Sequence, residues 1–241
     1  MRNVPLIFSF IIALMLLTAC EHPSNTQVLY VSYNYLGIRE GRTVKFYKTK
    51  DQLTWHYNST REFVSPGNFD DAFYFVGPYI GIRNGRTVKF YETNPQGTWA
   101  YGAGRDFTSP DDVDGVFHYN ADIIGVWHGK TIKFYLAHDN GTWSKSSVND
   151  FNAADDIDGA FNLNGSDLAI REGRTAKFYS LDARGNWTHI PGRDFTSPDR
   201  VDYMFYLATG AIGVVNGRNI TFYQVNENGS WTHKAGPDFN F

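Results

Sequence analysis

The 241-residue sequence is poor in residues that form covalent cross-links, because it contains one cysteine, Cys20. A single cysteine excludes any disulfide within the chain, so packing and hydrogen bonds must hold the fold. An excess of charge is lacking too: 22 Lys and Arg residues are balanced by 25 Asp and Glu residues, with a formal net charge of −3. Without a basic excess or a long run of like charges, the composition does not point to a nucleic-acid partner.

Long apolar stretches are also absent, apart from one run close to the N-terminus. Residues 4–17 are almost wholly apolar and follow a short, weakly basic start that contains Arg2. The run is too short for a typical membrane-spanning helix and fits the core of a signal peptide. We therefore expect residues 1–19 to be a targeting segment.

The end of this run, Leu17-Thr18-Ala19-Cys20, resembles the lipobox of bacterial lipoproteins. The resemblance implies cleavage before Cys20 and a diacylglycerol group on its thiol, with a further acyl chain such as palmitate on the new amine. Residues 20–25 would then be a lipidated tether, and two or three chains anchor stably to a membrane. By analogy with Gram-negative lipoproteins, Glu21 after the cysteine favours the outer membrane of the cell envelope. The alternative is an ordinary signal peptide with a chance cysteine.

The rest of the sequence repeats with a step of 44 residues and without insertion or deletion. The pair Phe-Tyr occurs at Phe46-Tyr47, Phe90-Tyr91, Phe134-Tyr135, Phe178-Tyr179 and Phe222-Tyr223. Tryptophan recurs at Trp55, Trp99, Trp143, Trp187 and Trp231, and glycine at Gly41, Gly85, Gly129, Gly173 and Gly217. Phenylalanine recurs at Phe63, Phe107, Phe151, Phe195 and Phe239. The copies are residues 26–69, 70–113, 114–157, 158–201 and 202–241.

One copy, residues 114–157, shows the elements of the unit. Runs with the composition of β-strands predict strands at residues 114–119, 122–127, 130–135 and 142–143. Glycine in the two-residue turn His128-Gly129 would supply the positive φ that tight hairpins need. Residues 144–156 are expected to be an irregular linker to the next copy.

Four strands in each of five 44-residue copies predict an all-β fold, a five-bladed β-propeller of four-stranded antiparallel blades over residues 26–241. Packing blade against blade around an axis buries both apolar faces of each sheet and leaves short protected edges. A β-solenoid is the main rival, but its shorter coils and capping ends are not seen. The last residues, Asp238 to Phe241, match the motif that leads into the next blade. We expect them to dock on the first blade and latch the ring.

Two known families resemble parts of this pattern. Residues 111–117 and 155–161, each ending in Asp-Gly-x-Phe, resemble the opening strand of hemopexin-type repeats, which begin with aspartate, two small residues and an aromatic or aliphatic residue. Hemopexin-like domains have four blades, so five copies depart from that family. Five short blades without insertions are similar in architecture to tachylectin-type lectin propellers, although that family's motif is missing here.

Four aspartates begin the predicted innermost strands, and the first copy has Thr26 instead; the four are Asp70, Asp114, Asp158 and Asp202. Placed around one mouth of a central channel, four carboxylates repel one another unless a cation compensates them. Hard oxygen ligands suit Ca²⁺ as a cofactor, and the hemopexin resemblance implies ions in this channel. The alternative is that each aspartate accepts hydrogen bonds from the backbone of its own turn.

Basic residues follow each hairpin glycine, at Arg42, Arg86, Lys130, Arg174 and Arg218. Lysines also recur on the third strand, at Lys45, Lys89, Lys133 and Lys177. Their repetition predicts either equivalent anion or glycan sites or ion pairs between blades. The acids available for such pairs are Glu62, Asp106, Asp150, Asp194 and Asp238.

Trp127 is the one tryptophan outside the repeat register, and its counterparts are Arg39, Arg83, Arg171 and Val215. Because arginine dominates this position, we expect it to be exposed. An exposed Trp127 would stack on a sugar or anchor a protein partner. The alternative is that Trp127 packs against its own neighbours.

The sequence offers little for catalysis. The seven histidines lack metal-ligand spacing, no glycine-rich phosphate loop occurs, and strict repetition without insertions leaves little room for one asymmetric catalytic site. The first hypothesis is therefore a non-enzymatic, lipid-anchored envelope module that recognises a glycan or envelope polymer through repeated sites between blades. The second is a protein-interaction platform, an inhibitor or assembly factor that uses one patch around Trp127. A hydrolase is the third.

Overall fold

A computed structural model describes residues 27–32, 35–50, 54–75, 77–163, 166–207, 210–234 and 238–241. The predicted signal peptide, the lipidated Cys20 and the tether lie outside the described residues. Within the described ranges, no helix is long and apolar enough to cross a membrane.

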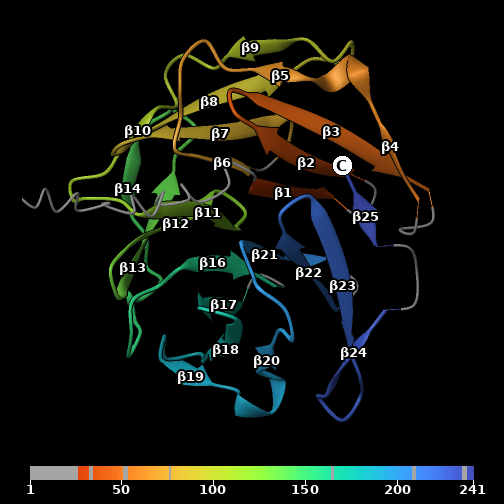
Figure 1. The fold of residues 1–241 in the computed structure, drawn as a ribbon. Helices are drawn as coiled ribbons and strands as arrows, with labels where there is room; N and C mark the ends of the chain where they lie inside the picture. The colour runs from red at the N-terminus through yellow and green to blue at the C-terminus, as the bar shows by residue number, and fades with distance from the viewer. Residues whose placement is uncertain are drawn as a thin grey trace, which may run out of the picture.

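The described chain forms five antiparallel sheets, one for each copy of the repeat (Figure 1). The first contains β1 (Gln27–Ser32), β2 (Tyr35–Glu40), β3 (Thr43–Thr49), β4 (Trp55–Tyr57) and β5 (Phe63–Val64). The second contains β6 (Asp71–Tyr74), β7 (Tyr79–Asn84), β8 (Thr87–Thr93), β9 (Trp99–Tyr101) and β10 (Phe107–Thr108). The third contains β11 (Gly115–Asn120), β12 (Ile123–His128), β13 (Thr131–Ala137), β14 (Trp143–Lys145) and β15 (Phe151–Asn152). The fourth contains β16 (Gly159–Asn162), β17 (Asp167–Glu172), β18 (Thr175–Leu181), β19 (Trp187–His189) and β20 (Phe195–Thr196). The fifth contains β21 (Tyr203–Leu207), β22 (Ala211–Asn216), β23 (Asn219–Val225), β24 (Trp231–His233) and β25 (Phe239–Asn240).

Each sheet is a blade with four strand positions, of which the outermost is broken in two. In blade 3, β14 pairs with the C-terminal part of β13 and β15 pairs with its N-terminal part. The predicted four-stranded blade is thus confirmed. The predicted linker over residues 144–156 is wrong in two respects, because its first two residues belong to β14 and because it contains the strand segment β15. In blades 1 and 4 the break holds a short 3-10 helix, η1 (Ser59–Arg61) or η2 (Pro191–Arg193).

The blades close into a ring whose inner wall is made by the first strand of each blade. Going around the ring, β1, β6, β11, β16 and β21 each lie against the next, and β21 returns to β1 (Figure 1). The hairpins between the second and third strands hold the expected glycines with positive φ, for example 61° at Gly41 and 55° at Gly129. These findings confirm the five-bladed propeller.

Aromatic residues of the repeat pack between blades as well as within them. The ring of Phe134 in blade 3 stacks on Trp187 of blade 4 with centroids 5.8 Å apart, and Phe151 meets the same tryptophan edge-on at 5.9 Å. The Trp187 Nε1–H donates to the carbonyl of Asn149 in blade 3 at 3.0 Å. The same arrangement recurs at Trp99, Trp143 and Trp231. Each of these four tryptophans therefore joins its blade to the preceding one through both packing and a hydrogen bond, whereas the buried Trp55 Nε1–H has no partner among the described residues.

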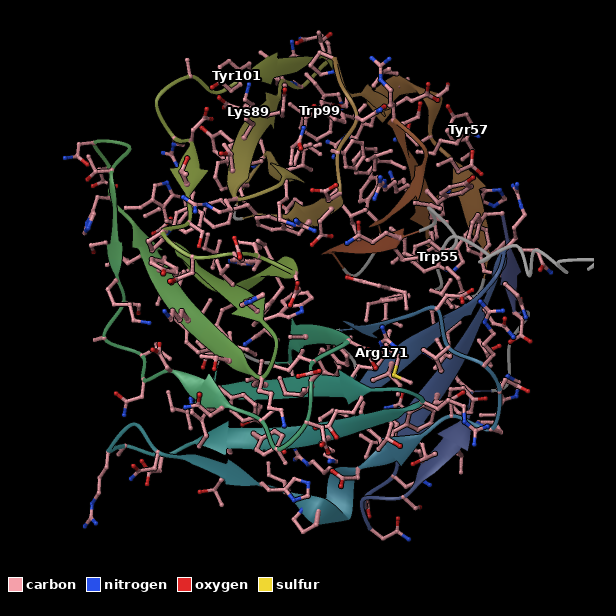
Figure 2. All side chains as sticks on the ribbon, turned by 60° about the vertical axis from the view of Figure 1, so that its left-hand side comes forward. Trp55, Tyr57, Lys89, Trp99, Tyr101 and Arg171 are labelled. Atoms are coloured by element: carbon pink, nitrogen blue, oxygen red, sulfur yellow. The ribbon has the colours of Figure 1, made fainter. Side chains whose placement is uncertain are left out.

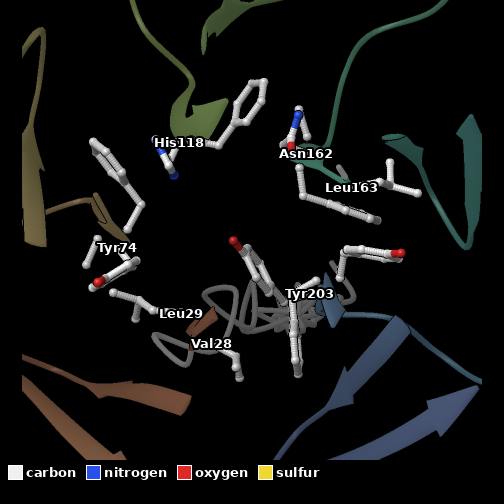
Figure 3. A pocket seen from close by; sticks show the side chains of 14 residues that line it. Val28, Leu29, Tyr74, His118, Asn162, Leu163 and Tyr203 are labelled. Carbon is white, nitrogen blue, oxygen red and sulfur yellow. The ribbon is translucent and has the colours of Figure 1, made fainter. Parts of the chain in front are cut away.

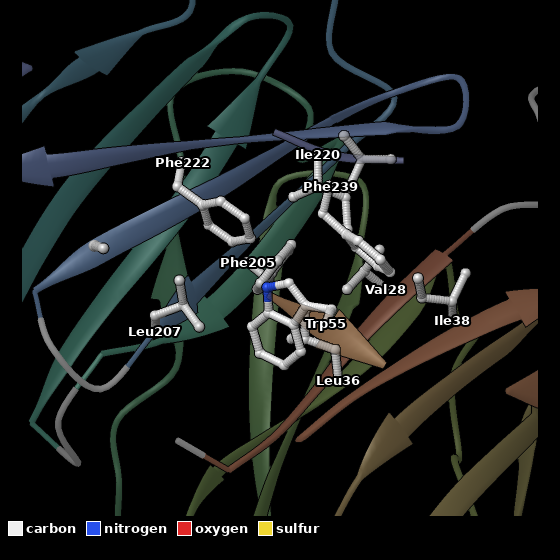
Figure 4. Packing of buried hydrophobic residues seen from close by; sticks show 11 residues of the cluster. Val28, Leu36, Ile38, Trp55, Phe205, Leu207, Ile220, Phe222 and Phe239 are labelled. Atoms are coloured by element: carbon white, nitrogen blue, oxygen red, sulfur yellow. The ribbon is translucent and has the colours of Figure 1, made fainter. Parts of the chain in front are cut away.

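The ring closes between blades 5 and 1 with the last residues of the chain. Segment β25 pairs with β23, so its backbone belongs to blade 5. Its Phe239 ring contacts Tyr47 of blade 1 edge-on at 5.0 Å and joins the buried cluster that contains Val28 and Trp55 (Figure 4). The predicted latch on blade 1 is therefore made by side chains, while the strand pairing is to blade 5.

Candidate functional site

The four aspartates at the starts of the blades bind their own hairpin turns. In blade 2, Asp70 Oδ2 accepts the backbone N–H of Gly85 at 2.7 Å, and Asp158 accepts that of Gly173 at 2.6 Å. Asp114 and Asp202 do the same for their blades. Among the described residues, no three His, Cys, Asp or Glu side chains lie close enough to hold one metal ion. The structure thus favours the turn role over the predicted calcium site.

The basic residues after the hairpin glycines mostly hold backbone carbonyls. Arg42 Nη2 donates to the Ser65 carbonyl at 2.7 Å, and Lys130 Nζ donates to that of Ala154 at 2.6 Å. Arg174 and Arg218 bind the carbonyls of Pro198 and Phe241 in the same way, whereas the Arg86 side chain makes no hydrogen bond within the described residues. Four of these five predicted binding residues therefore fix the end of their own blade.

The acids expected to pair with these basic residues have other partners. Each binds the side chain five positions earlier, on the outer strand of its own blade. These pairs are Tyr57 with Glu62, Tyr101 with Asp106, Lys145 with Asp150, His189 with Asp194, and His233 with Asp238. The predicted pairing between blades is wrong for these five acids, because their strand segments lie side by side within one blade.

Trp127 is buried, so the prediction of an exposed ring is wrong. Only 8% of its surface is exposed, and the ring packs against Phe117 with centroids 6.1 Å apart. Its cross-strand partner is Gly115, and a Cβ there would lie 2.1 Å from the indole. The glycine makes room for the ring. Of the arginines at this position, Arg83 is buried as well, at 7% exposed, and donates to the Asp114 carbonyl of the next blade at 3.1 Å, whereas Arg39 and Arg171 are half-buried.

A buried polar cluster at the channel was not found from the sequence. Asp71 is 7% exposed and accepts hydrogen bonds from the Gln27 amide of blade 1 and from Val116 N of blade 3 at 3.1 Å. Arg83 Nε lies 3.7 Å from the same carboxylate. Burial raises the pKa of Asp71, and the nearby Arg83 opposes that rise. The cluster joins three blades. The sequence indicates it in one way: Gln27, Asp71 and Tyr203 occupy equivalent positions of the repeat but are three different residue types.

A cavity of about 310 Å³ lies inside the ring, between the first strands of the five blades (Figure 3). Its walls include Phe73 and Phe117, and Tyr203 points into it (Figure 3). The polar groups at its rim are held by nearby turns. His118 Nε2, for example, lies 2.8 Å from the Ala121 carbonyl, and burial lowers the pKa of this imidazole. The cavity is thus chiefly an apolar space whose polar groups already have partners.

Two further pockets lie between blades and occupy the same register of the repeat. The pocket between blades 1 and 2 has a volume of about 130 Å³ and is lined by Ser65, Pro66, Gly67, Asn68, Ile82, Asn84, Thr87, Lys89 and Tyr91. The pocket between blades 2 and 3 has a volume of about 200 Å³ and is lined by Ser109, Asp111, Asp112, Val126, His128, Thr131, Lys133 and Tyr135. Every residue of the second set lies 44 positions after a residue of the first. The repeat therefore builds equivalent pockets at successive interfaces.

The two equivalent pockets differ in charge. Lys133 Nζ lies 2.7 Å from Asp111 Oδ2, and this contact lowers the pKa of Asp111 and raises the pKa of Lys133. In the other pocket Lys89 is exposed, and its ammonium group lies 5.6 Å from the centre of the Tyr101 ring (Figure 2). Within the described residues, Lys89 has no carboxylate at ion-pair distance.

Comparison with known proteins supports the fold without supplying a ligand. Neither a family model nor a curated protein matches the sequence. Among solved structures, a protein from Lactobacillus plantarum is 12% identical with a TM-score of 0.50, over 84% of this chain and 67% of its own. A functionally unknown protein from Desulfotomaculum acetoxidans is 12% identical with a TM-score of 0.53, over 89% of this chain and 74% of its own. At this identity the chain is similar to both in fold alone.

Proposed function

We propose that this chain is a non-enzymatic binding module of the bacterial envelope that recognises a glycan or envelope polymer through the pockets between its blades. The observation that carries the proposal is the pair of pockets in one register, at Lys89 and at Lys133. Hydroxyl and charged groups line each pocket beside a tyrosine, Tyr91 or Tyr135, and the pocket at Lys89 also has two side-chain amides. Such a mixture suits a polyhydroxylated ligand, because polar groups fix its orientation and an apolar wall covers its ring.

The lipid anchor expected at Cys20 gives the proposal its location. A module held at a membrane by two or three acyl chains would face polymers of the envelope. Weak sites repeated around one rigid ring gain avidity on a polymer that presents the same unit many times. The propeller fold is compatible with such a module.

Native mass spectrometry with neutral saccharides, such as glucose and its oligomers, tests this proposal. We expect more than one adduct on the wild-type protein. Thr87→Tyr and Thr131→Tyr, which fill the two pockets from equivalent strand positions, should each remove one adduct. Thr98→Tyr, on an exposed turn, is the matched control and should bind like the wild type. An adduct pattern that neither pocket variant alters would contradict the proposal.

A protein partner is the second candidate. Its predicted anchor, Trp127, is buried, but three large apolar side chains on the outer strands of blades 1 and 2 are exposed. Tyr57 and Tyr101 (Figure 2) are each 46% exposed. Val64 is 59% exposed. Exposed aromatic side chains are common anchors of protein interfaces. Capture of one stoichiometric partner by the wild type, and its loss in Tyr57→Ser and Tyr101→Ser, would favour this candidate over the glycan.

A further inference from the structure

We infer that the pocket between blades 1 and 2 binds the carboxylate of an acidic saccharide, such as a uronic acid, and that the other interfaces reject it. This inference rests on the proposed function and names the ligand class for one of its sites. It depends on a comparison of the same lysine position in successive blades.

Lysine occupies this position in four blades, and in three of them a carboxylate neutralises it. Lys45 lies 2.5 Å from Glu40, Lys133 lies 2.7 Å from Asp111, and Lys177 lies 2.5 Å from Glu172. In blade 5 the position holds Thr221. Lys89 is therefore the exception, since the described residues place no carboxylate at ion-pair distance from it.

The residues that replace the acids explain this difference. Asn84 stands where blades 1 and 4 have Glu40 and Glu172, and Gly67 stands where the connection before blade 3 has Asp111. The Asn84 side chain donates to the Asn68 carbonyl at 3.3 Å, which holds this amide at the pocket. The lining thus offers an ammonium group, amides and hydroxyls, without an acid.

An anionic ligand would complete this lining. A carboxylate bound to Lys89 would form a charge-assisted hydrogen bond, which is about twice as strong as a neutral one. At the other lysine positions the same ligand would meet Asp111, Glu40 or Glu172 and be repelled. The volume of about 130 Å³ accommodates the acidic end of one sugar, with the remainder in solvent.

Calorimetric titration of the full-length protein with glucuronate, glucose and acetate tests this inference. We expect one glucuronate site, bound at least tenfold more tightly than either glucose or acetate, and an affinity that falls as salt is added. Lys89→Gln should lower the glucuronate affinity about tenfold, the loss of one charge-assisted hydrogen bond, and should weaken glucose binding much less. Lys133→Gln, at the equivalent lysine that Asp111 already neutralises, is the matched control and should not lower the glucuronate affinity.

A second variant asks whether the site can be transferred to the next interface. The triple variant Asp111→Gly, Asp112→Asn and His128→Asn reproduces the polar side chains of the blade 1–2 pocket around Lys133. We expect it to bind a second glucuronate.

Four outcomes would overturn the inference. They are equal affinity for glucuronate and glucose, equal affinity for acetate and glucuronate, no effect of Lys89→Gln, or an equal effect of Lys133→Gln. With any of these four outcomes, the proposed function would still hold if native mass spectrometry detects several glucose adducts. If neither saccharide binds, both the inference and the proposed function fail.

Discussion

At the scale of single residues, pairs of small and large side chains across two strands decide what fits near the channel. Gly115 faces Trp127, and Gly159 faces Arg171. In blade 5 the order is reversed, with Tyr203 facing Val215. In each of these three pairs one large side chain therefore faces a smaller residue, although the residue types change. A substitution at either glycine tests how much space its partner leaves.

Gly115→Ala should destabilise the protein, because the new Cβ would lie 2.1 Å from the Trp127 ring, which is buried and unable to move away freely. Overpacking of this kind costs about 1–3 kcal/mol. Gly159→Ala is the matched control, since its Cβ would lie 3.3 Å from Arg171 Nε. Urea denaturation of both variants measures the difference, and equal stabilities would show that the Trp127 ring repacks without penalty.

At Tyr119, by contrast, removal of the hydroxyl group should stabilise the protein. Its side chain is 2% exposed, its hydroxyl has no hydrogen-bond partner among the described residues, and burial raises its pKa to about 12. An unpaired buried hydroxyl costs about 1–3 kcal/mol. Tyr119→Phe, which copies Phe75 of blade 2, should therefore raise the free energy of unfolding by about 1 kcal/mol. A clear loss of stability in thermal or chemical denaturation would contradict this.

At the scale of elements, each blade is organised around the hairpin between its second and third strands. In blades 3, 4 and 5, the aspartate at the start of the blade accepts the N–H of the turn glycine, and the basic residue after that glycine donates to a backbone carbonyl just beyond the outer strand. In blade 4 these residues are Asp158, Gly173 and Arg174. One turn therefore joins the innermost and outermost parts of its sheet.

Asp158→Ala should lower the free energy of unfolding by about 1 kcal/mol, because the Gly173 N–H loses its acceptor. Asp155→Ala, at a nearby exposed acid, should leave stability unchanged. A turn role also predicts that calcium and chelators have no effect on the melting temperature of the wild type. A chelator-sensitive melting temperature that becomes insensitive in Asp158→Ala would instead restore the calcium hypothesis.

Sequence periodicity predicted the elements well and their side-chain contacts less well. The strands, the hairpin glycines and the five blades follow from local patterns that repeat every 44 residues. The burial of Trp127 does not follow from that pattern, because it depends on the missing side chain of Gly115 across the strand pair. The cluster at Asp71 was equally hidden, since its partners come from three blades. The Lys89 position was found, but its lack of an acid became visible only when the lining was known.

At the scale of the whole molecule, the ring has four interfaces joined by continuous chain and one where the first and last blades meet. At this closing interface the described residues share no strand between blades 1 and 5, so side chains alone hold it. Phe239 packs against Tyr47, and Arg218 Nη2 lies 3.2 Å from Glu40. Because no peptide link supports these contacts, the closing interface should be the first to open.

Deletion of residues 238–241 should lower the melting temperature by several degrees. The deletion removes the pairing of β25 with β23 and the contacts of Phe239 with blade 1. For a protein of this size, each kcal/mol of lost stability lowers the melting temperature by about 2–4 °C.

Comparison of Phe239→Ala with Phe151→Ala separates ring closure from ordinary packing. Phe151 makes the corresponding contacts at the interface of blades 3 and 4, where the chain is continuous. Both variants should be less stable, but only Phe239→Ala should accelerate amide hydrogen exchange in β1 and β23 before global unfolding. Uniform exchange in the two variants would mean that the ring opens as one cooperative unit, so that the closing contacts of Phe239 matter no more than those of any other blade interface.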